Sequence, residues 1–178
     1  HCPYSQILQQ KFYKPRHMNL GIYKKIVDEA CEFEGVIFRL VCDGEPMMHP
    51  NFLDMVAYAK QKMIRPLCFN TNATLLDEYV SREILRYGVD VVEISLDAIN
   101  KTTYERIRNG ADYSKVMLNV HRFIKMRSDL NSNTKIMVSI IDQPEAESEI
   151  GEFIAYWSAK VDRVITRTYT SIGGLVGT

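Results

Sequence analysis

Segments patterned as strands alternate with segments patterned as helices along this 178-residue chain. Each short apolar run of strand character is followed by a segment with apolar residues at helical spacing. A strand, a helix and a further strand in succession imply a parallel sheet with right-handed crossovers, so we predict an α/β fold. The expected strands are Val36–Cys42, Leu67–Thr71, Val89–Leu96, Lys135–Ile141 and Val161–Tyr169.

The expected helices begin at side chains that can cap them, and two of them end at glycine. Asn19 and Asp77 are candidate N-caps, and the helices that follow them are expected to stop at Gly35 and Gly88. A hydrophobic content of 46% is enough for one core, so a single domain over residues 1–178 is expected. Further helices are expected over Pro50–Met63, over Thr102–Arg108, from Asp112 onward and over Glu145–Ala159.

Polar side chains alternate with apolar ones along two of the expected strands. A parallel strand that helices cover on both faces should be apolar throughout, so these strands have one polar face. The sequence therefore predicts a curved parallel sheet with helices on one side only, an open or partial TIM-like barrel. The polar side chains are Glu93, Ser95 and Asp97 along one strand, and Asn70 and Asn72 along the other.

The turn Gly44-Glu45-Pro46 follows the first expected strand. Glycine lets the backbone approach a ligand closely, and proline makes the turn rigid. The carboxylate of Glu45 is thus placed at the carboxyl edge of the sheet, where α/β folds bind their ligands. The alternative is an ordinary acidic loop residue.

Three motifs in this order resemble those of the radical S-adenosylmethionine (SAM) enzymes. A further segment resembles one branch of this family, the enzymes with a C-terminal auxiliary-cluster (SPASM) domain. This branch includes the sulfatase-maturating and peptide-modifying enzymes, and the segment is Thr103-Tyr104-Glu105-Arg106-Ile107-Arg108-Asn109-Gly110. The resemblance runs from His1 to about Gly174 and implies that residues 1–178 are an incomplete core domain without the SPASM domain. The implied fold is a partial (β/α)6 TIM-like barrel with parallel strands and its first strand missing from this segment. The three motifs are Gly44-Glu45-Pro46, Thr71-Asn72-Ala73-Thr74-Leu75-Leu76 and Val92-Glu93-Ile94-Ser95-Leu96-Asp97-Ala98.

The resemblance implies two cofactors, a [4Fe–4S] cluster and SAM. The family holds the cluster by the three thiolates of a CxxxCxxC loop; Cys2 is similar to the third cysteine, and the other two would precede residue 1. His1 is similar to the ring-bearing residue that packs near adenine. The implied activity is reductive cleavage of SAM to a radical that abstracts hydrogen. The implied partners are an electron donor such as flavodoxin or ferredoxin and an unknown peptide, protein or small-molecule substrate.

The resemblance also implies roles for the residues at the carboxyl edge. Glu45 is similar to the residue that accepts a hydrogen bond from the methionine amino group, on a turn shaped by Gly44 and Pro46. Arg108 is similar to a positively charged residue that pairs with the SAM carboxylate, although a solvated arginine at a helix end is an alternative. A helix cap is the alternative for Asp97. The positions similar to those near the ribose and the methionine carboxylate are Asn72, Ser95 and Asp97.

The remaining candidate residues have simpler interpretations. Cys31 and Cys42 are expected to be small buried hydrophobic residues, whereas Cys68 can face the polar side of the sheet. A turn role is expected for His49, and surface positions are expected for His17 and His121. The residues that could contact a substrate on the polar face are Arg39, Met137, Ser139 and Arg167.

Charge and composition limit the function classes. The 22 basic and 22 acidic residues are balanced and unclustered, so no nucleic-acid partner is expected. No apolar run is long enough to cross a membrane, and four irregularly spaced cysteines favour a reducing cytoplasm. Two other functions stay open: a non-redox TIM-like enzyme for a small phosphorylated metabolite, with Gly173-Gly174 as its phosphate loop, and a binding domain of this fold without a cluster.

Overall fold

A single parallel sheet organises the structure, a computed structural model that describes residues 14, 16–41 and 44–169. Its five strands lie in the order β1-β2-β3-β4-β5, so strands that are consecutive in the sequence are adjacent in the sheet. All four pairings are parallel, which brings the carboxyl ends of the strands to one edge. The strands are β1 (Phe38–Leu40), β2 (Leu67–Thr71), β3 (Val91–Ser95), β4 (Lys135–Asp142) and β5 (Arg163–Thr168).

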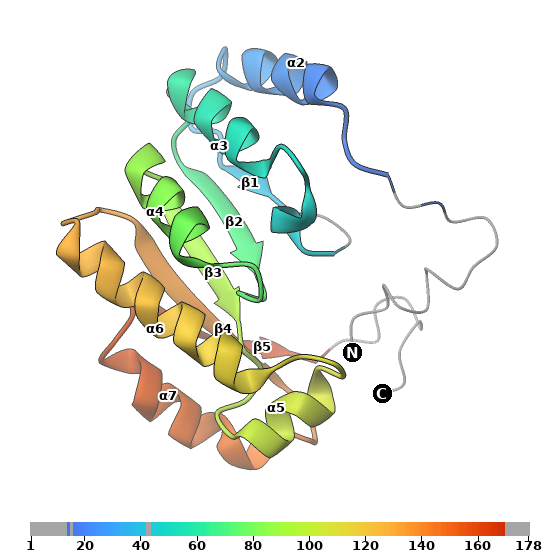
Figure 1. The fold of residues 1–178 in the computed structure, drawn as a ribbon, viewed down its shortest axis with the longest axis vertical. Helices are drawn as coiled ribbons and strands as arrows, with labels where there is room; N and C mark the ends of the chain where they lie inside the picture. The colour runs from blue at the N-terminus through green and yellow to red at the C-terminus, as the bar shows by residue number, and fades with distance from the viewer. Residues whose placement is uncertain (1–13, 15, 42–43, 170–178) are drawn as a thin grey trace.

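The long helices cover one face of the sheet, and the opposite face carries no helix within the described ranges (Figure 1). A shorter helix, α5 (Lys101–Ile107), lies at the carboxyl end of β3, and the 3-10 turns η1 (Pro46–Met48) and η2 (Glu147–Glu149) follow β1 and β4. The predicted α/β architecture, a parallel sheet from a TIM-like barrel, is confirmed. The covering helices are α2 (Leu20–Ala30), α3 (Phe52–Gln61), α4 (Glu78–Tyr87), α6 (Tyr113–Asp129) and α7 (Ile150–Ser158).

The hydrophobic core fills the space between the sheet and these helices. Alternate residues of the three central strands are buried against the helices: Leu67 and Phe69 of β2, Val92 and Ile94 of β3, and Ile136, Val138 and Ile140 of β4. The ring of Phe69 meets that of Phe52 in α3 edge to face, with 5.2 Å between centroids. The other face of each strand is therefore available for polar side chains.

Capping side chains begin the helices where the sequence predicts. Asn19 accepts a hydrogen bond from the backbone N–H of Gly21 at 2.8 Å, and Asp77 accepts one from Val80 at 2.8 Å. Gly88 ends α4 in the left-handed conformation, with φ of 70°. Helix α2 instead ends before the predicted stop at Gly35, because its C-cap is Cys31.

The left-handed Gly88 gives a prediction about stability. No atom lies within 4 Å of a Cβ added there, so Gly88→Ala should cost only the left-handed conformation, about 1–2 kcal/mol of unfolding free energy. Gly151 in α7 also has room for a Cβ but is helical, so Gly151→Ala should be neutral or stabilise by up to about 1 kcal/mol. Urea unfolding of both variants measures this; equal effects of the two changes would contradict it.

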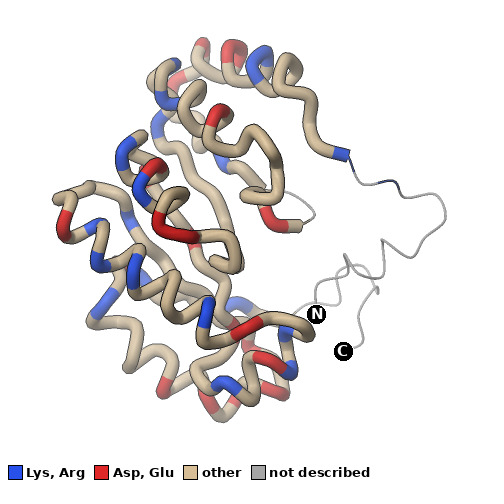
Figure 2. Tube along the Cα trace, in the orientation of Figure 1, with Lys and Arg blue, Asp and Glu red and all other residues tan. Residues whose placement is uncertain are grey.

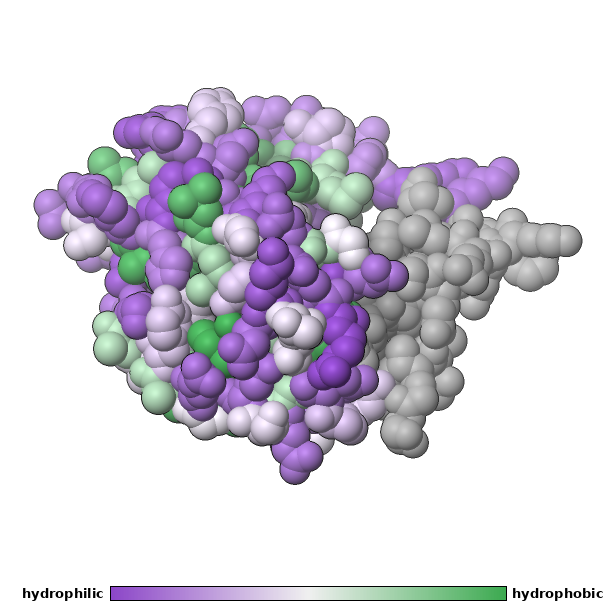
Figure 3. Space-filling model, turned by 60° about the horizontal axis from the view of Figure 1, so that its bottom comes forward, coloured by the Kyte–Doolittle hydropathy of each residue, from purple (hydrophilic) through white to green (hydrophobic). Residues whose placement is uncertain are grey.

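Charges of both signs are interspersed over the outer helices (Figure 2). On the face shown in Figure 3, hydrophobic atoms form small groups separated by hydrophilic ones. Among the described residues, no helix combines the length and apolar character that a membrane crossing requires.

Candidate functional site at the carboxyl edge of the sheet

Glu45 joins the turn after β1 to the end of β2. Its carboxylate accepts hydrogen bonds from the backbone N–H of Asn72 at 2.7 Å and of Met47 at 3.5 Å, and it caps η1, which Pro46 begins. Glu45 is only 9% exposed. Burial raises its pKa above the usual 4.5, although these hydrogen bonds and the charge of Arg108 act in the opposite direction. The edge therefore holds a buried carboxyl group whose charge is poorly solvated.

The loop after β2 is held in one conformation by side chains. The side-chain oxygen of Asn72 accepts hydrogen bonds from the backbone N–H and the hydroxyl of Thr74, at 2.9 and 2.6 Å. Ala73 has a φ of 60°, and its carbonyl accepts a hydrogen bond at 2.8 Å from the amide of Asn119 in α6. Asn119 thus supports the loop that presents the Asn72 N–H to Glu45. The signal for it in the sequence was an asparagine on the apolar stripe of a predicted helix.

Asp97 and Arg108 form an ion pair at the same edge. The guanidinium Nη2 of Arg108 lies 2.6 Å from Oδ2 of Asp97, and both side chains are largely buried. Neither alternative from the sequence holds, because the N-cap position of α5 is Asn100 rather than Asp97, and Arg108 is not a solvated side chain. Asp97 has a φ of 62°, beyond the last strand residue Ser95, so strand alternation does not fix its direction relative to Ser95.

Two buried hydrogen-bond donors near this ion pair have no partner among the residues that the structure describes. They are the hydroxyl of Tyr104 and Nε of Arg108, separated by one turn of α5. The guanidinium carbon of Arg108 lies 5.9 Å from the Tyr104 ring centroid. An unsatisfied buried donor is costly, so a ligand with acceptor oxygens would be stabilised here.

The predicted edge residues are therefore brought together in part. Glu45 contacts Asn72 directly, Asp97 contacts Arg108 directly, and burial raises the pKa of Glu45 in spite of a small opposing effect of the charge of Arg108. Ser95, half-buried, ends β3 opposite Ser139 of β4 at the same edge. Gly44 precedes Glu45 with a φ of 139°. The predicted cluster ligand Cys2 and its neighbour His1 lie outside the described residues.

The other cysteines and histidines correct some expectations. Cys31 is exposed rather than buried, because α2 ends just before it. Cys68 is buried in β2, and His49 has the predicted turn role, since its Nδ1 accepts the Asn51 N–H at 3.0 Å. His121, expected at the surface, is half-buried, and its ring stacks on Trp157 with 5.4 Å between centroids. His17 is exposed as predicted, and Cys42 lies outside the described residues.

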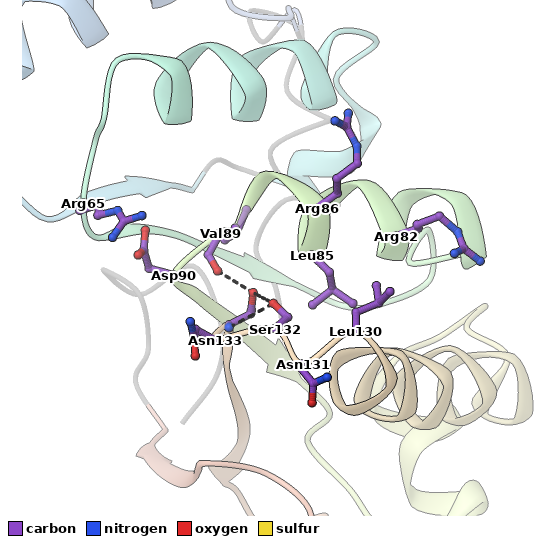
Figure 4. Close-up of a pocket in the computed structure, with 12 residues that line it drawn as sticks. Arg65, Arg82, Leu85, Arg86, Val89, Asp90, Leu130, Asn131, Ser132 and Asn133 are labelled. Carbon is purple, nitrogen blue, oxygen red and sulfur yellow. Dashed lines mark hydrogen bonds between the residues drawn. The ribbon is translucent and has the colours of Figure 1, made fainter.

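No group of three or more His, Cys, Asp or Glu side chains in the described part of the chain is arranged to hold a metal ion. A cavity of about 600 Å³ does open at the opposite edge of the sheet, between α4 and the turn after α6 (Figure 4). Its lining includes Arg65, Asp90 and Thr134, which precede β2, β3 and β4. Arg82 and Arg86 of this cavity pair with acidic residues of their own helix. This cavity is separate from the edge site, because it lies at the amino ends of the strands.

A family model described as the radical SAM superfamily matches residues 1–154. The chain belongs to the radical SAM superfamily. The members of this superfamily are enzymes whose cofactors are a [4Fe–4S] cluster and SAM, as the motifs predicted. This match gives no support to the alternative of a non-redox TIM-like enzyme for a small phosphorylated metabolite.

Known relatives share this core. The chain is 29% identical over 145 residues to the tungsten-containing aldehyde ferredoxin oxidoreductase cofactor-modifying protein of Pyrococcus furiosus, covering 78% of this chain and 39% of that protein. It is 29% identical over 146 residues to a GTP 3′,8-cyclase of Clostridium botulinum, covering 79% of this chain and 44% of the cyclase. The chain thus spans about two fifths of the length of these relatives.

Solved structures confirm the fold. SuiB of Streptococcus suis, bound to the precursor peptide SuiA, superposes with a TM-score of 0.77 at 14% identity, covering 98% of this chain and 38% of SuiB. SuiB bound to SAM gives a TM-score of 0.72 at 15% identity, covering 90% of this chain and 36% of SuiB.

The donor and acceptor groups at the carboxyl edge have the chemistry that the methionine part of SAM requires. The unsatisfied Nε of Arg108 suits a carboxylate, and the buried carboxylate of Glu45 suits an ammonium group. The described residues supply no three-thiolate set for the cluster, and Cys2 lies outside them.

Proposed function

We propose that this chain is the SAM-binding core of a radical SAM enzyme of the SPASM-type branch. The observation that carries the proposal is that one edge of the sheet holds both a buried carboxylate, on Glu45, and a buried, unsatisfied hydrogen-bond donor, on Arg108. The methionine part of SAM has one ammonium and one carboxylate group, so it needs both kinds of partner. Parallel sheets bind ligands at this edge.

Each residue of the proposed site has a distinct task. Glu45 binds the methionine ammonium, and it stays in place because the backbone N–H of Asn72 holds its other oxygen. Arg108 uses Nε for the methionine carboxylate, while Asp97 fixes the guanidinium through Nη2. Ser95 and the side chain of Asn72 lie at the same edge and supply hydrogen bonds for the ribose. Together with the cluster, SAM supplies a carbon radical able to abstract hydrogen.

Cys2 is proposed as one cluster ligand, with His1 packing near the adenine. The enzyme also needs an electron donor such as flavodoxin or ferredoxin, and a cytoplasmic location would keep its thiols reduced. The substrate binds on the helix-free face of the sheet, beside the SAM site. The proposed domain covers residues 1–178, and the activity of the whole protein depends on the longer polypeptide that relatives of this kind possess.

The cluster assignment is tested by cysteine replacement in the full-length protein. After anaerobic reconstitution, Cys2→Ala should lose about four irons per chain, the content of one such cluster, because the remaining thiolates cannot hold it. Iron assay, EPR of the reduced cluster with and without SAM, and formation of 5′-deoxyadenosine measure the change.

Cys31→Ala is the matched control, because Cys31 is an exposed thiol at the end of α2. It should keep the iron content and the EPR response of the unmodified protein. If Cys2→Ala also keeps them and still forms 5′-deoxyadenosine, the assignment of Cys2 is wrong.

A further inference from the structure

A cluster of charged side chains joins three strands on the helix-free face of the sheet. Glu93 lies in the middle of β3 and is 2% exposed. Arg39 of β1 donates to it from Nη1 at 3.2 Å, and Arg167 of β5 donates from Nε at 3.1 Å. Arg39 also donates to Oδ1 of Asn70 in β2 at 2.8 Å. The first and last strands of the sheet therefore both reach the same buried carboxylate.

The position of the cluster follows from strand alternation. Val92 and Ile94, on either side of Glu93, are buried against the helices, so Glu93 points to the face without helices. Ser95, at the carboxyl edge, shares that face because it is two residues further along β3. The charged cluster thus lies beside the proposed SAM site and on the same surface.

The charges in this cluster do not balance. Burial alone raises the pKa of Glu93, but the hydrogen bonds and charges of Arg167 and Arg39 outweigh burial and hold the pKa below its usual value. Glu93 is therefore ionised at neutral pH, and one negative charge faces two positive ones. Arg163, exposed and on the same face of β5 by alternation, adds a further positive charge. These four side chains together carry a net positive charge.

Both guanidinium groups keep capacity for another partner. The side chain of Arg39 is 40% exposed and that of Arg167 is 48% exposed, whereas that of Glu93 is 3% exposed. Among the described residues, no hydrogen bond uses Nη2 of Arg39 or Nη1 of Arg167. Glu93 restricts the motion of both side chains, so they lose less freedom when they bind an oxyanion than free arginines would.

We infer that Arg39 and Arg167, positioned by Glu93, bind an anionic oxygen group of the substrate, a carboxylate or a phosphate. This inference rests on the proposed function, since it names the chemical class that the same site accepts. A guanidinium matches the geometry of both kinds of oxyanion, and two guanidinium groups that contact the same carboxylate, one at each of its oxygens, favour an anionic group over a neutral one. If the cluster served only to stabilise the contacts between the strands, it would bind no anion.

The test titrates the full-length protein at low ionic strength with two probes, inorganic phosphate and acetate. The readouts are calorimetry and the NMR shifts of the arginine Nε–H groups. Arg39→Gln and Arg167→Gln should each weaken binding of the preferred probe by at least about tenfold, because each removes a charge-assisted contact. The probe that binds more tightly identifies the group as a phosphate or a carboxylate.

Further variants separate binding from folding. Lysine at position 39 or 167 keeps the charge opposite Glu93 but loses the planar fork, so Arg39→Lys and Arg167→Lys should bind the probe with intermediate affinity. Arg82→Gln is the matched control, because Arg82 is an arginine at the opposite edge that pairs with Glu78 of its own helix. It should leave anion binding unchanged.

SAM titrations of the same proteins separate this inference from the proposed function. If SAM binds and neither probe binds, or if both glutamine variants bind the probe as the unmodified protein does, the anion site is wrong. If SAM does not bind but the probe binds through Arg39 and Arg167, the proposed function is wrong and the anion site stands.

Discussion

Glu45→Gln is expected to weaken SAM binding by the full-length protein by about 10- to 100-fold, because a hydrogen bond to a charged group contributes about 1.5–3 kcal/mol. The glutamine has nearly the shape of the glutamate and differs in charge. Its amide oxygen can still accept the Asn72 N–H that the carboxylate accepts at 2.7 Å. The turn should therefore keep its place while losing its attraction for the methionine ammonium. Calorimetry under anaerobic conditions measures the affinity.

Glu149→Gln is the matched control. Glu149 is also a buried glutamate near this edge, and it accepts backbone N–H groups, from Ile99 and Asn100, both at 3.0 Å. It has no role in the proposed site, so Glu149→Gln should bind SAM as the unmodified protein does. An equal loss of affinity in both variants would show that removing any buried carboxylate loosens this edge, and would remove Glu45 from its role.

The pH dependence of binding distinguishes a charge from a structural role. Because burial raises the pKa of Glu45, the carboxyl group takes up a proton at a higher pH than usual, and the neutral form attracts ammonium poorly. SAM affinity should then be constant above this pKa and should fall below it by up to about tenfold per pH unit. In Glu45→Gln this dependence should be absent. An unchanged pH profile would contradict the role of Glu45 even if the affinity falls.

The sheet could be predicted from the sequence because its signals are local. Strand β2 has the predicted bounds, Leu67–Thr71, since its apolar residues are buried and a turn residue stands on each side. Strand β1 is shorter than predicted, at Phe38–Leu40, because it pairs along one side only among the described strands. The one-sided cover of helices followed from the polar residues of β3, whose orientation depends only on alternation.

The site could be predicted only where a motif marked it. The Gly-Glu-Pro turn identified Glu45, and the order of motifs located Asp97 and Arg108. The partners of Glu93 could not be derived, because Arg39 and Arg167 are 54 and 74 residues away in the chain and meet it through the strand order. The left-handed φ of Asp97 was also beyond prediction, since strand alternation gives no sign of where the strand stops.

Phe69→Ala is expected to cause the largest loss of stability, about 3–5 kcal/mol of unfolding free energy, the usual cost of deleting a buried aromatic ring. Phe69 lies in the central part of β2, is fully buried, and packs edge to face on Phe52 of α3. Its removal leaves a cavity between the sheet and α3 that neither rigid element can close. Urea unfolding monitored by circular dichroism measures the free energy.

Phe33→Ala is the control for this change, because Phe33 is 68% exposed after the end of α2 and its removal should alter stability by less than about 0.5 kcal/mol. Phe69→Leu fills part of the space and should cost clearly less than Phe69→Ala, since the penalty grows with the volume left empty. A cost for Phe69→Ala no greater than that for Phe33→Ala would mean that β2 and α3 do not pack as described. The turn that carries Glu45 leads directly into α3, so the same result would also weaken the argument for a rigid carboxylate at the edge of the sheet.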